Sequence, residues 1–111
     1  MIGCDIIGID RIAKSYSKYG EHFLRRILTQ AETELFYKRN SSVAFLAGRF
    51  AVKEAVAKAY RTGIGRMGFT DIEVLPDENG APTVTIHGKS VAGLEVSISH
   101  CKEYAIAVCK K

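Results

Sequence analysis

The chain has 111 residues, of which 47% are hydrophobic and 25% charged, and its formal net charge is +4 at pH 7. This length predicts one small domain over residues 1–111, and the composition is typical of soluble globular proteins. No apolar stretch reaches the roughly 18 residues of a membrane span, and the N-terminus lacks the basic and apolar segments of a signal peptide. We therefore expect a cytoplasmic protein with an anionic partner: a nucleic acid, an acidic protein or a phosphorylated ligand.

The cysteines Cys4, Cys101 and Cys109 are odd in number and show no Cys-x-x-Cys spacing. That arrangement disfavours both a disulfide framework and a zinc site. We interpret all three as small reduced residues of the core.

The N-terminal segment predicts a strand and then a helix. Residues 1–9 are rich in isoleucine, which favours a short buried strand, and Asp5 is the only charged side chain in it. Asp10 is a candidate cap for a helix that ends near Tyr19, with Gly20 after it. An aspartate among strand isoleucines costs free energy unless a partner compensates it. Backbone amides would make Asp5 a structural residue, whereas a hard cation would make it a ligand.

Two further helices are predicted before the centre of the chain. A short amphipathic segment surrounds residues 23–28. Thr29 and Glu32 then have the spacing of a capping box, which predicts a helix through about Arg39.

The most informative segment is a long helix from about Val43 to Tyr60, which the polar residues 40–42 can cap. It is apolar nearly all round, and such helices are usually buried. Removing an ion from water costs several kcal/mol unless the ion is paired or bound, so charges on this helix suggest a site. Four charged side chains stand in its segment 45–59: Arg49, Lys53, Glu54 and Lys58.

The helical period divides these charges into two pairs. Glu54 and Lys58 share one face, where they could equally form an ordinary i,i+4 pair on a solvated surface. Arg49 and Lys53 share another face, and like charges one turn apart repel each other. This second pair makes more sense if an anion lies across it.

The C-terminal half changes from a helical to a strand period. Strands are predicted over about 69–75, 83–86, 94–99 and 104–109, and the last two pair with each other. The resulting order, a strand, then helices, then an antiparallel meander, indicates an α+β domain with the long helix packed on the sheet. Its thin core and its sheet edges favour an oligomer.

Asp5 and Glu54 are the two carboxylates on apolar elements, which makes them the natural pair of ligands for a divalent ion. Mg²⁺ typically binds one or two protein carboxylates, several waters and the phosphates of a substrate.

Two other segments are weaker candidates for a ligand site. Gly63 and Gly65 form either a helix end and turn or a loop whose backbone approaches a ligand. His100 is either a surface residue or a donor to a phosphate.

Together these residues resemble the holo-acyl-carrier-protein synthases, the small bacterial 4′-phosphopantetheinyl transferases. The resemblance runs along almost the whole chain, and its most specific part is the helix sequence at 45–59. The matching segments are GCDI at 3–6, FLAGRFAVKEAVAKA at 45–59, TGIGR at 62–66, VSISH at 96–100 and KEYA at 102–105.

The resemblance implies an enzyme that moves the 4′-phosphopantetheine group of coenzyme A, its substrate, onto a serine of apo acyl carrier protein. Adenosine 3′,5′-bisphosphate is the other product. By this resemblance Asp5, Glu54 and Lys58 are the catalytic residues, with Asp5 and Glu54 binding Mg²⁺ and Lys58 contacting the phosphates. The other positions near coenzyme A are Arg49, Gly63, Gly65 and His100.

The resemblance also implies a homotrimer with sites between protomers and a basic docking surface for an acidic acyl carrier protein. This docking surface comprises Arg11, Lys14 and Lys18, and Asp10 adds a negative charge beside it. In the expected reaction the serine hydroxyl loses its proton either to Glu54 or to a metal-bound water. The sequence does not choose between these two bases.

Two other classes of protein are alternatives to the transferase. One is a binding protein without catalysis, a basic oligomer that holds coenzyme A or another nucleotide. The other is a small nucleic-acid-binding protein, prompted by the net charge alone. Against the latter, the sequence has no aromatic stacking platform and no recognition-helix motif.

Overall fold

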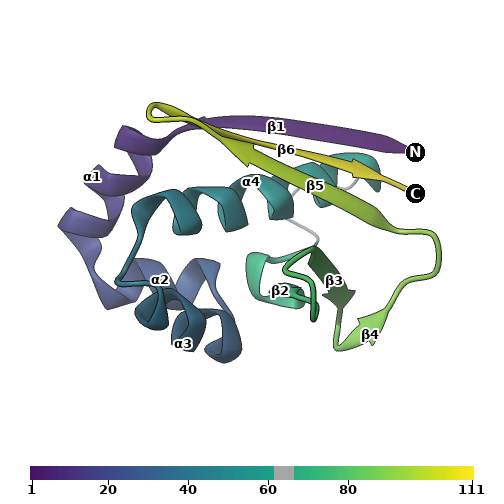
Figure 1. Ribbon diagram of the computed structural model, residues 1–111, viewed down its shortest axis with the longest axis horizontal. Coiled ribbons are helices and arrows are strands. Elements are labelled where there is room, and N and C mark those ends of the chain that lie inside the picture. The colour runs from purple at the N-terminus through teal and green to yellow at the C-terminus, as the bar shows by residue number, and fades with distance from the viewer. Residues whose placement is uncertain (62–66) are drawn as a thin grey trace.

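The computed structural model describes residues 1–61 and 67–111 (Figure 1). Within these ranges the chain passes from one strand through four α-helices to a short 3-10 helix and five further strands. The expected α+β architecture, with a long helix against an antiparallel sheet, is confirmed. The elements are β1 (Ile2–Gly8), α1 (Ile9–Tyr19), α2 (Glu21–Ile27), α3 (Gln30–Lys38), α4 (Val43–Ala59), η1 (Phe69–Asp71), β2 (Ile72–Pro76), β3 (Pro82–Ile86), β4 (Lys89–Ser90), β5 (Glu95–His100) and β6 (Tyr104–Lys110).

The strands form two separate antiparallel sheets. The first has the order β1-β6-β5, in which Ile6 lies opposite Ile106, and β5 pairs with β6 as expected. The second has the order β2-β3-β4. The single meander that we predicted was therefore wrong. After β3 the backbone is left-handed at His87 and Gly88, with φ of 51° and 77°, so the chain turns back and β4 pairs with β3. In the other sheet, β1 pairs with the edge of β6 that β5 leaves free.

Helix α4 lies at the centre of the molecule. Figure 1 shows it running beneath the sheet β1-β6-β5, with α2, α3 and the β2–β3 hairpin on its other side. Leu46, Val52 and Val56 are fully buried on it, as the apolar sequence predicted. Nevertheless, no helix in the described ranges is both long enough and apolar enough to cross a membrane.

Strand β1 packs directly on the backbone of α4. A Cβ atom added to Gly3 would overlap the carbonyl oxygen of Ala55 and lie 2.6 Å from the amide nitrogen of Ala59, closer than real Cβ atoms approach. Glycine is therefore required at this crossing. Because side chains alternate along a strand, Asp5 points to the same face of β1 as Gly3, the face toward α4.

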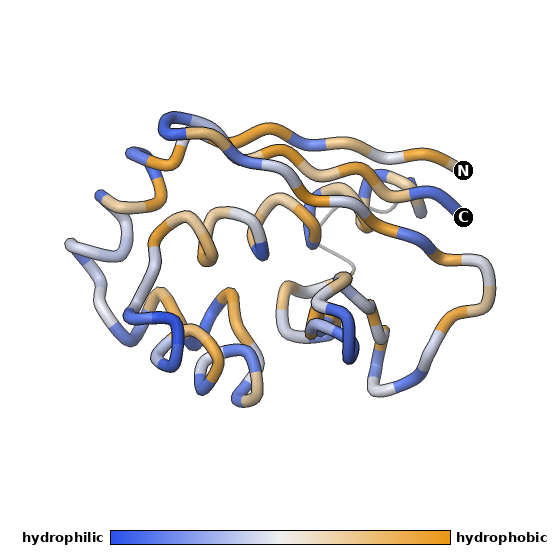
Figure 2. The backbone as a smooth tube through the Cα atoms, viewed as in Figure 1, coloured by the Kyte–Doolittle hydropathy of each residue, from blue (hydrophilic) through white to orange (hydrophobic). Residues whose placement is uncertain are grey.

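The opposite face of the sheet is apolar and exposed. Ile2 and Ile6 of β1 are 73% and 61% exposed, so the prediction of a buried strand holds only for the face that bears Ile7. Figure 2 shows that hydrophobic residues recur along both β1 and β6. We call this surface the outer face; its apolar side chains are Ile2, Ile6, Tyr104, Ile106 and Val108.

Most helix ends agree with the sequence, and one does not. Thr29 and Glu32 form the predicted capping box of α3, and Ser42 accepts a hydrogen bond from the Phe45 amide at the start of α4. Asp10 is not the cap of α1, because Gly8 occupies that position. Asp10 instead lies in the first turn, where a negative charge is favourable, and pairs with Lys14 at 3.0 Å.

The interpretation of the cysteines is correct for one of the three. Cys109 is buried, whereas Cys4 and Cys101 are exposed. Cys4 is exposed because it alternates with Gly3 and Asp5 and so points to the outer face of β1. Cys101 lies in the turn between β5 and β6.

Candidate functional site

Asp5 contacts α4 through an ion pair. The Lys58 Nζ donates a hydrogen bond of 2.9 Å to the Asp5 Oδ1, and the Asp5 side chain is only 13% exposed. Among the described residues, the other carboxylate oxygen, Oδ2, is buried without a hydrogen-bond partner. Backbone amides therefore do not satisfy this carboxylate. Since buried oxygens normally have partners, an ion or ligand can complete this one.

Glu54 lies close enough to Asp5 for the two charges to interact. Burial raises the pKa of Glu54, the Asp5 carboxylate raises it further, and Lys58 and Arg11 act in the opposite direction. The hydrogen bond to Asp5 raises the pKa of Lys58. The Glu54 carboxylate is thus not fully compensated by its cationic neighbours, which favours the binding of a further cation.

The donor set fits Mg²⁺ better than a transition metal. Within the described part of the chain, no three His, Cys, Asp or Glu side chains come together as a metal-binding group. Two carboxylates, one of them with an unpartnered oxygen, match an ion that keeps waters and shares itself with substrate phosphates. We refer to Asp5, Glu54 and Lys58 as the carboxylate site.

The raised pKa of Glu54 leads to a prediction about stability. The folded protein keeps the Glu54 proton over a pH range, starting at the ordinary value of 4.5, in which the unfolded chain has lost it. The free energy of unfolding therefore falls as the pH rises through that range. We expect Glu54→Gln, in EDTA at neutral pH, to raise the melting temperature by a few degrees, and the gain to shrink toward pH 4.5. Thermal melts followed by circular dichroism over this pH range measure the effect.

Glu34→Gln, at an exposed position of α3, is the matched control and should leave the melting temperature nearly unchanged. A Glu54→Gln variant no more stable than this control at neutral pH would contradict the prediction.

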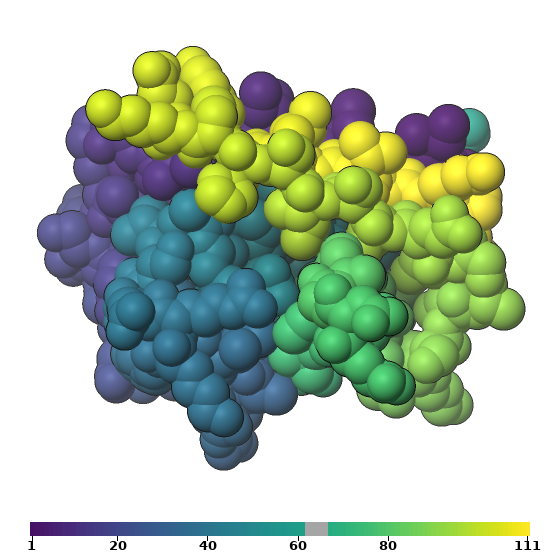
Figure 3. Space-filling model, in the orientation of Figure 1, coloured from purple at the N-terminus to yellow at the C-terminus, as the bar shows by residue number. Residues whose placement is uncertain are grey.

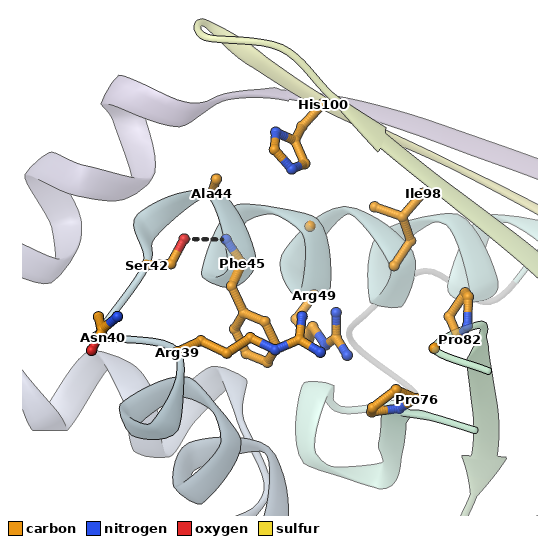
Figure 4. A pocket seen from close by; sticks show the side chains of 12 residues that line it. Arg39, Asn40, Ser42, Ala44, Phe45, Arg49, Pro76, Pro82, Ile98 and His100 are labelled. Atoms are coloured by element: carbon orange, nitrogen blue, oxygen red, sulfur yellow. Dashed lines mark hydrogen bonds between the residues drawn. The ribbon is translucent and has the colours of Figure 1, made fainter. Parts of the chain in front are cut away.

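A second group of side chains lines a cavity of about 560 Å³ between the start of α4, the end of β5 and the β2–β3 hairpin. Figure 3 shows these three segments meeting on one face of the molecule. Figure 4 shows His100 on one side of the cavity and Arg39 and Arg49 beside Phe45 on the other. The lining residues are Arg39, Asn40, Ser42, Ala44, Phe45, Gly48, Arg49, Pro76, Gly80, Pro82, Ile98 and His100.

Arg49 is the most buried charge in this cavity. Its guanidinium lies 4.1 Å from the centre of the Phe45 ring, and its Nε donates a hydrogen bond of 3.3 Å to the carbonyl oxygen of Val74. Burial lowers the pKa of Arg49 to about 10, so that the side chain stays charged at neutral pH. Arg39 contacts the same ring at 5.2 Å. The cavity therefore combines positive charge with apolar walls, which suits a phosphorylated aromatic ligand.

Lys53 does not share an external anion with Arg49, and that expectation was wrong. Its side chain is fully buried, and its Nζ pairs with the Glu32 Oε1 at 2.6 Å and donates to the carbonyl oxygen of Ile27, also at 2.6 Å. Burial lowers the pKa of Lys53, and the Glu32 carboxylate opposes that shift. The anion that neutralises Lys53 is therefore Glu32 of the chain itself.

The other expected site residues lie in different places. Gly63 and Gly65 fall outside the described residues. The docking-surface residues Arg11, Lys14 and Lys18 are all exposed on α1, and Arg11 lies near enough to Glu54 to influence its pKa. The basic side of α1, where docking is predicted, thus borders the carboxylate site.

The carboxylate site lies against β1 in the second half of α4, whereas the cavity lies at the start of α4, between the end of β5 and the β2–β3 hairpin. Lys58 contacts Asp5 of β1, whereas Arg49 contacts Val74 of β2, and Figure 1 shows β1 and β2 on different sides of the helix. The structure therefore brings Asp5 next to Lys58, and it brings Arg49 and His100 into one cavity. Within the single chain these two pairs of residues lie apart. Arg39 was missed, because no sequence pattern connects the end of α3 with a cavity on α4.

Comparisons with known proteins identify the fold and its relatives. A family model described as the 4′-phosphopantetheinyl transferase superfamily matches residues 1–109. Proteins named holo-[acyl-carrier-protein] synthase from Chlorobaculum tepidum and Bacillus subtilis are each 47% identical, over 109 and 111 residues. These alignments cover 96% of this chain and 93% and 89% of the two relatives.

Two solved structures extend this similarity to three dimensions. The holo-[acyl-carrier-protein] synthase of Helicobacter pylori in complex with coenzyme A has a TM-score of 0.87 and 36% identity, covering 98% of this chain and 97% of that one. The enzyme of Bacillus anthracis in complex with coenzyme A (3′,5′-ADP) has a TM-score of 0.83 and 41% identity, covering 97% and 91%.

Proposed function

Because this chain belongs to the 4′-phosphopantetheinyl transferase superfamily, we propose that Asp5 and Glu54 hold the Mg²⁺ ion with which it catalyses the family reaction. That reaction transfers the 4′-phosphopantetheine group of coenzyme A to a serine of apo acyl carrier protein and releases adenosine 3′,5′-bisphosphate. The observation that carries the metal assignment is the Oδ2 of Asp5, which is buried and has no hydrogen-bond partner among the described residues. Glu54, whose charge interacts with that of Asp5, supplies the second carboxylate.

Each residue of the carboxylate site has a role in this proposal. When bound, Mg²⁺ neutralises charge on the diphosphate of coenzyme A. Lys58, exposed beside Asp5, stabilises the charge that develops on the transferred phosphoryl group. In this proposal Glu54, whose pKa is raised by burial, accepts the proton of the serine hydroxyl.

The cavity beside α4 is the proposed place of the adenosine 3′,5′-bisphosphate part of coenzyme A. Arg39, Arg49 and His100 offer cationic and donor groups to phosphates, and Phe45 with Pro82 offers apolar surface to the base. The sequence already predicts Arg49 and His100 near coenzyme A. The lining of the cavity is the reason to add Arg39 to these residues.

We further propose a homotrimer in which each site lies between two copies. Two observations support assembly. The carboxylate site and the cavity lie on different parts of α4, so a ligand in contact with both is best held by two protomers. The outer face also exposes a contiguous apolar surface of a kind that marks interaction sites. The number of copies follows from the family resemblance, and the cytoplasmic location stays a prediction.

Charge reversal on α1 tests the docking surface. We expect the double variant Lys14→Glu/Lys18→Glu to raise the Michaelis constant for the carrier protein roughly tenfold, because two attractive charges become repulsive. Coenzyme A binding should not change. Arg11 is left intact in this variant because it also influences Glu54.

Steady-state kinetics with carrier protein and coenzyme A varied separately measure both constants. Lys38→Glu/Lys89→Glu, two exposed reversals away from α1, is the control for net charge. A Michaelis constant that moves equally in the control and in the α1 double variant would remove α1 from the docking surface.

Intact mass spectrometry of an apo acyl carrier protein tests the function directly. After incubation with this chain, coenzyme A and Mg²⁺, the carrier mass should increase by one phosphopantetheine group, and EDTA should prevent the increase. A protein that binds coenzyme A but leaves the carrier mass unchanged would instead be the binding oligomer considered above.

A further inference from the structure

Glu32 is a fully buried carboxylate that joins three elements of the fold. Its Oε1 accepts hydrogen bonds from the Thr29 amide at 2.8 Å and from the Lys53 Nζ at 2.6 Å. Its Oε2 accepts a hydrogen bond of 2.8 Å from the amide of Val74 in β2. Since Glu32 belongs to α3 and Lys53 to α4, this one side chain links both helices to the strand.

Val74 is held by charged side chains at both of its backbone groups. Its amide donates to Glu32, and its carbonyl oxygen accepts the hydrogen bond from Arg49. Strand β2 lies at an edge of the sheet β2-β3-β4, where backbone groups would otherwise lack partners. Glu32 and Arg49 thus take the place of a neighbouring strand and fix the position of β2 along α4.

The strand held in this way carries one wall of the cavity. Pro76 follows Val74 by two residues and pairs with Pro82 across the hairpin, and both prolines line the cavity. The opposite wall bears Phe45 and Arg49 of α4. The separation of the two walls therefore depends on directed bonds, whereas apolar packing has no direction. These are the bonds that hold Val74 and the hydrogen bond that the Thr29 hydroxyl donates to Glu73 of the same strand.

We propose that Glu32 and Lys53 are positioning residues for coenzyme A. Lys53 neutralises and orients Glu32, and Glu32 holds the β2–β3 hairpin at the distance from Arg49 that the ligand requires. This inference rests on the proposed function, because it assumes that adenosine 3′,5′-bisphosphate occupies the cavity.

Two double variants separate positioning from simple core stability. Both replace Lys53 by methionine, so neither contains an unpaired buried ammonium group. In Glu32→Gln/Lys53→Met the glutamine carbonyl can still accept the hydrogen bond of the Val74 amide. The Thr29 amide, whose hydrogen bond Oε1 accepts in the wild type, loses its acceptor in both double variants, so the two variants differ at Val74. In Glu32→Met/Lys53→Met the Val74 amide loses its partner. Glu78→Gln, exposed in the hairpin turn, is the control.

The dissociation constant of adenosine 3′,5′-bisphosphate is measured by calorimetry for each folded variant. We expect the Met/Met variant to bind roughly tenfold more weakly than wild type, the size expected for one lost buried hydrogen bond. The Gln/Met variant and the control should stay close to wild type, and the Michaelis constant for carrier protein should not change. Equal dissociation constants in the two folded double variants would overturn the proposal.

Hydrogen exchange on the wild-type protein gives a second test that needs no variant to fold. If the hairpin position and the cavity are coupled, adenosine 3′,5′-bisphosphate should slow exchange of the Val74 amide more than that of Ala57, a fully buried residue in the last turn of α4. Equal slowing at both amides would contradict the inference. A wild-type protein that does not bind the bisphosphate would instead refute the proposed function of the cavity.

Discussion

Asp5→Asn should lower the rate of phosphopantetheine transfer by roughly 10²–10³-fold, the usual loss when one group that stabilises transition-state charge is removed. Asparagine keeps the shape of the side chain, and its carbonyl oxygen can still accept the hydrogen bond from Lys58. The variant loses the negative charge and the buried oxygen that are proposed to bind Mg²⁺. Formation of holo carrier protein at saturating coenzyme A and increasing Mg²⁺ measures the loss, which added metal should not restore.

Metal binding provides a readout of Asp5→Asn that is independent of turnover. A ligand that binds only the folded state raises the melting temperature, so Mg²⁺ should stabilise the wild-type protein and the Glu34→Gln control but not Asp5→Asn. If Asp5→Asn retained both the transfer rate and the stabilisation by Mg²⁺, the metal would have to bind elsewhere.

Ile106→Lys should dissociate the oligomer and abolish transfer while leaving each chain folded. Ile106 lies at the centre of the outer face, opposite Ile6 on the neighbouring strand, and is 42% exposed in the single chain. A charge buried there between copies costs several kcal/mol, and in the isolated chain the lysine can reach solvent. Sedimentation velocity and far-UV circular dichroism separate the loss of assembly from a loss of fold.

Tyr37→Lys is the matched control for this variant. Tyr37 is a large side chain of similar exposure, 45%, on α3 rather than on the outer face, and a lysine there can still pair with Glu21, its present partner. The control should keep the oligomeric state and the activity. An Ile106→Lys protein that remains assembled and active would exclude the outer face as the interface.

The sequence located the charges that matter, because an apolar helix makes each charge conspicuous. The helical period correctly placed Lys58 and Arg49 on different sides of α4. It could not identify the partner of Lys53, because Glu32 lies 21 residues away on another helix. The contact depends on how α3 packs against α4, which no local pattern reports. The capping-box pattern already explained Glu32 as part of a helix cap, so nothing in the sequence pointed to a distant partner.

The strands were predicted as segments but not as a sheet arrangement. Their alternating side chains revealed the hairpin of β5 and β6, a local pairing. The pairing of β1 with β6 joins the two ends of the chain, so no local pattern reports it. The isoleucines of β1 stand on both faces of the strand, and this pattern is the same whether the second face is covered by the chain itself or by another copy.

The crossing of β1 over α4 determines which parts of the carboxylate site evolution can alter. At Gly3 the two backbones touch with no side chain between them, so the gap between strand and helix is already at its minimum. Any larger residue at this position would push the two elements apart and carry Asp5 away from Glu54. Selection can therefore tune this ion site by exchanging the surrounding side chains, but not by bringing its two halves closer together.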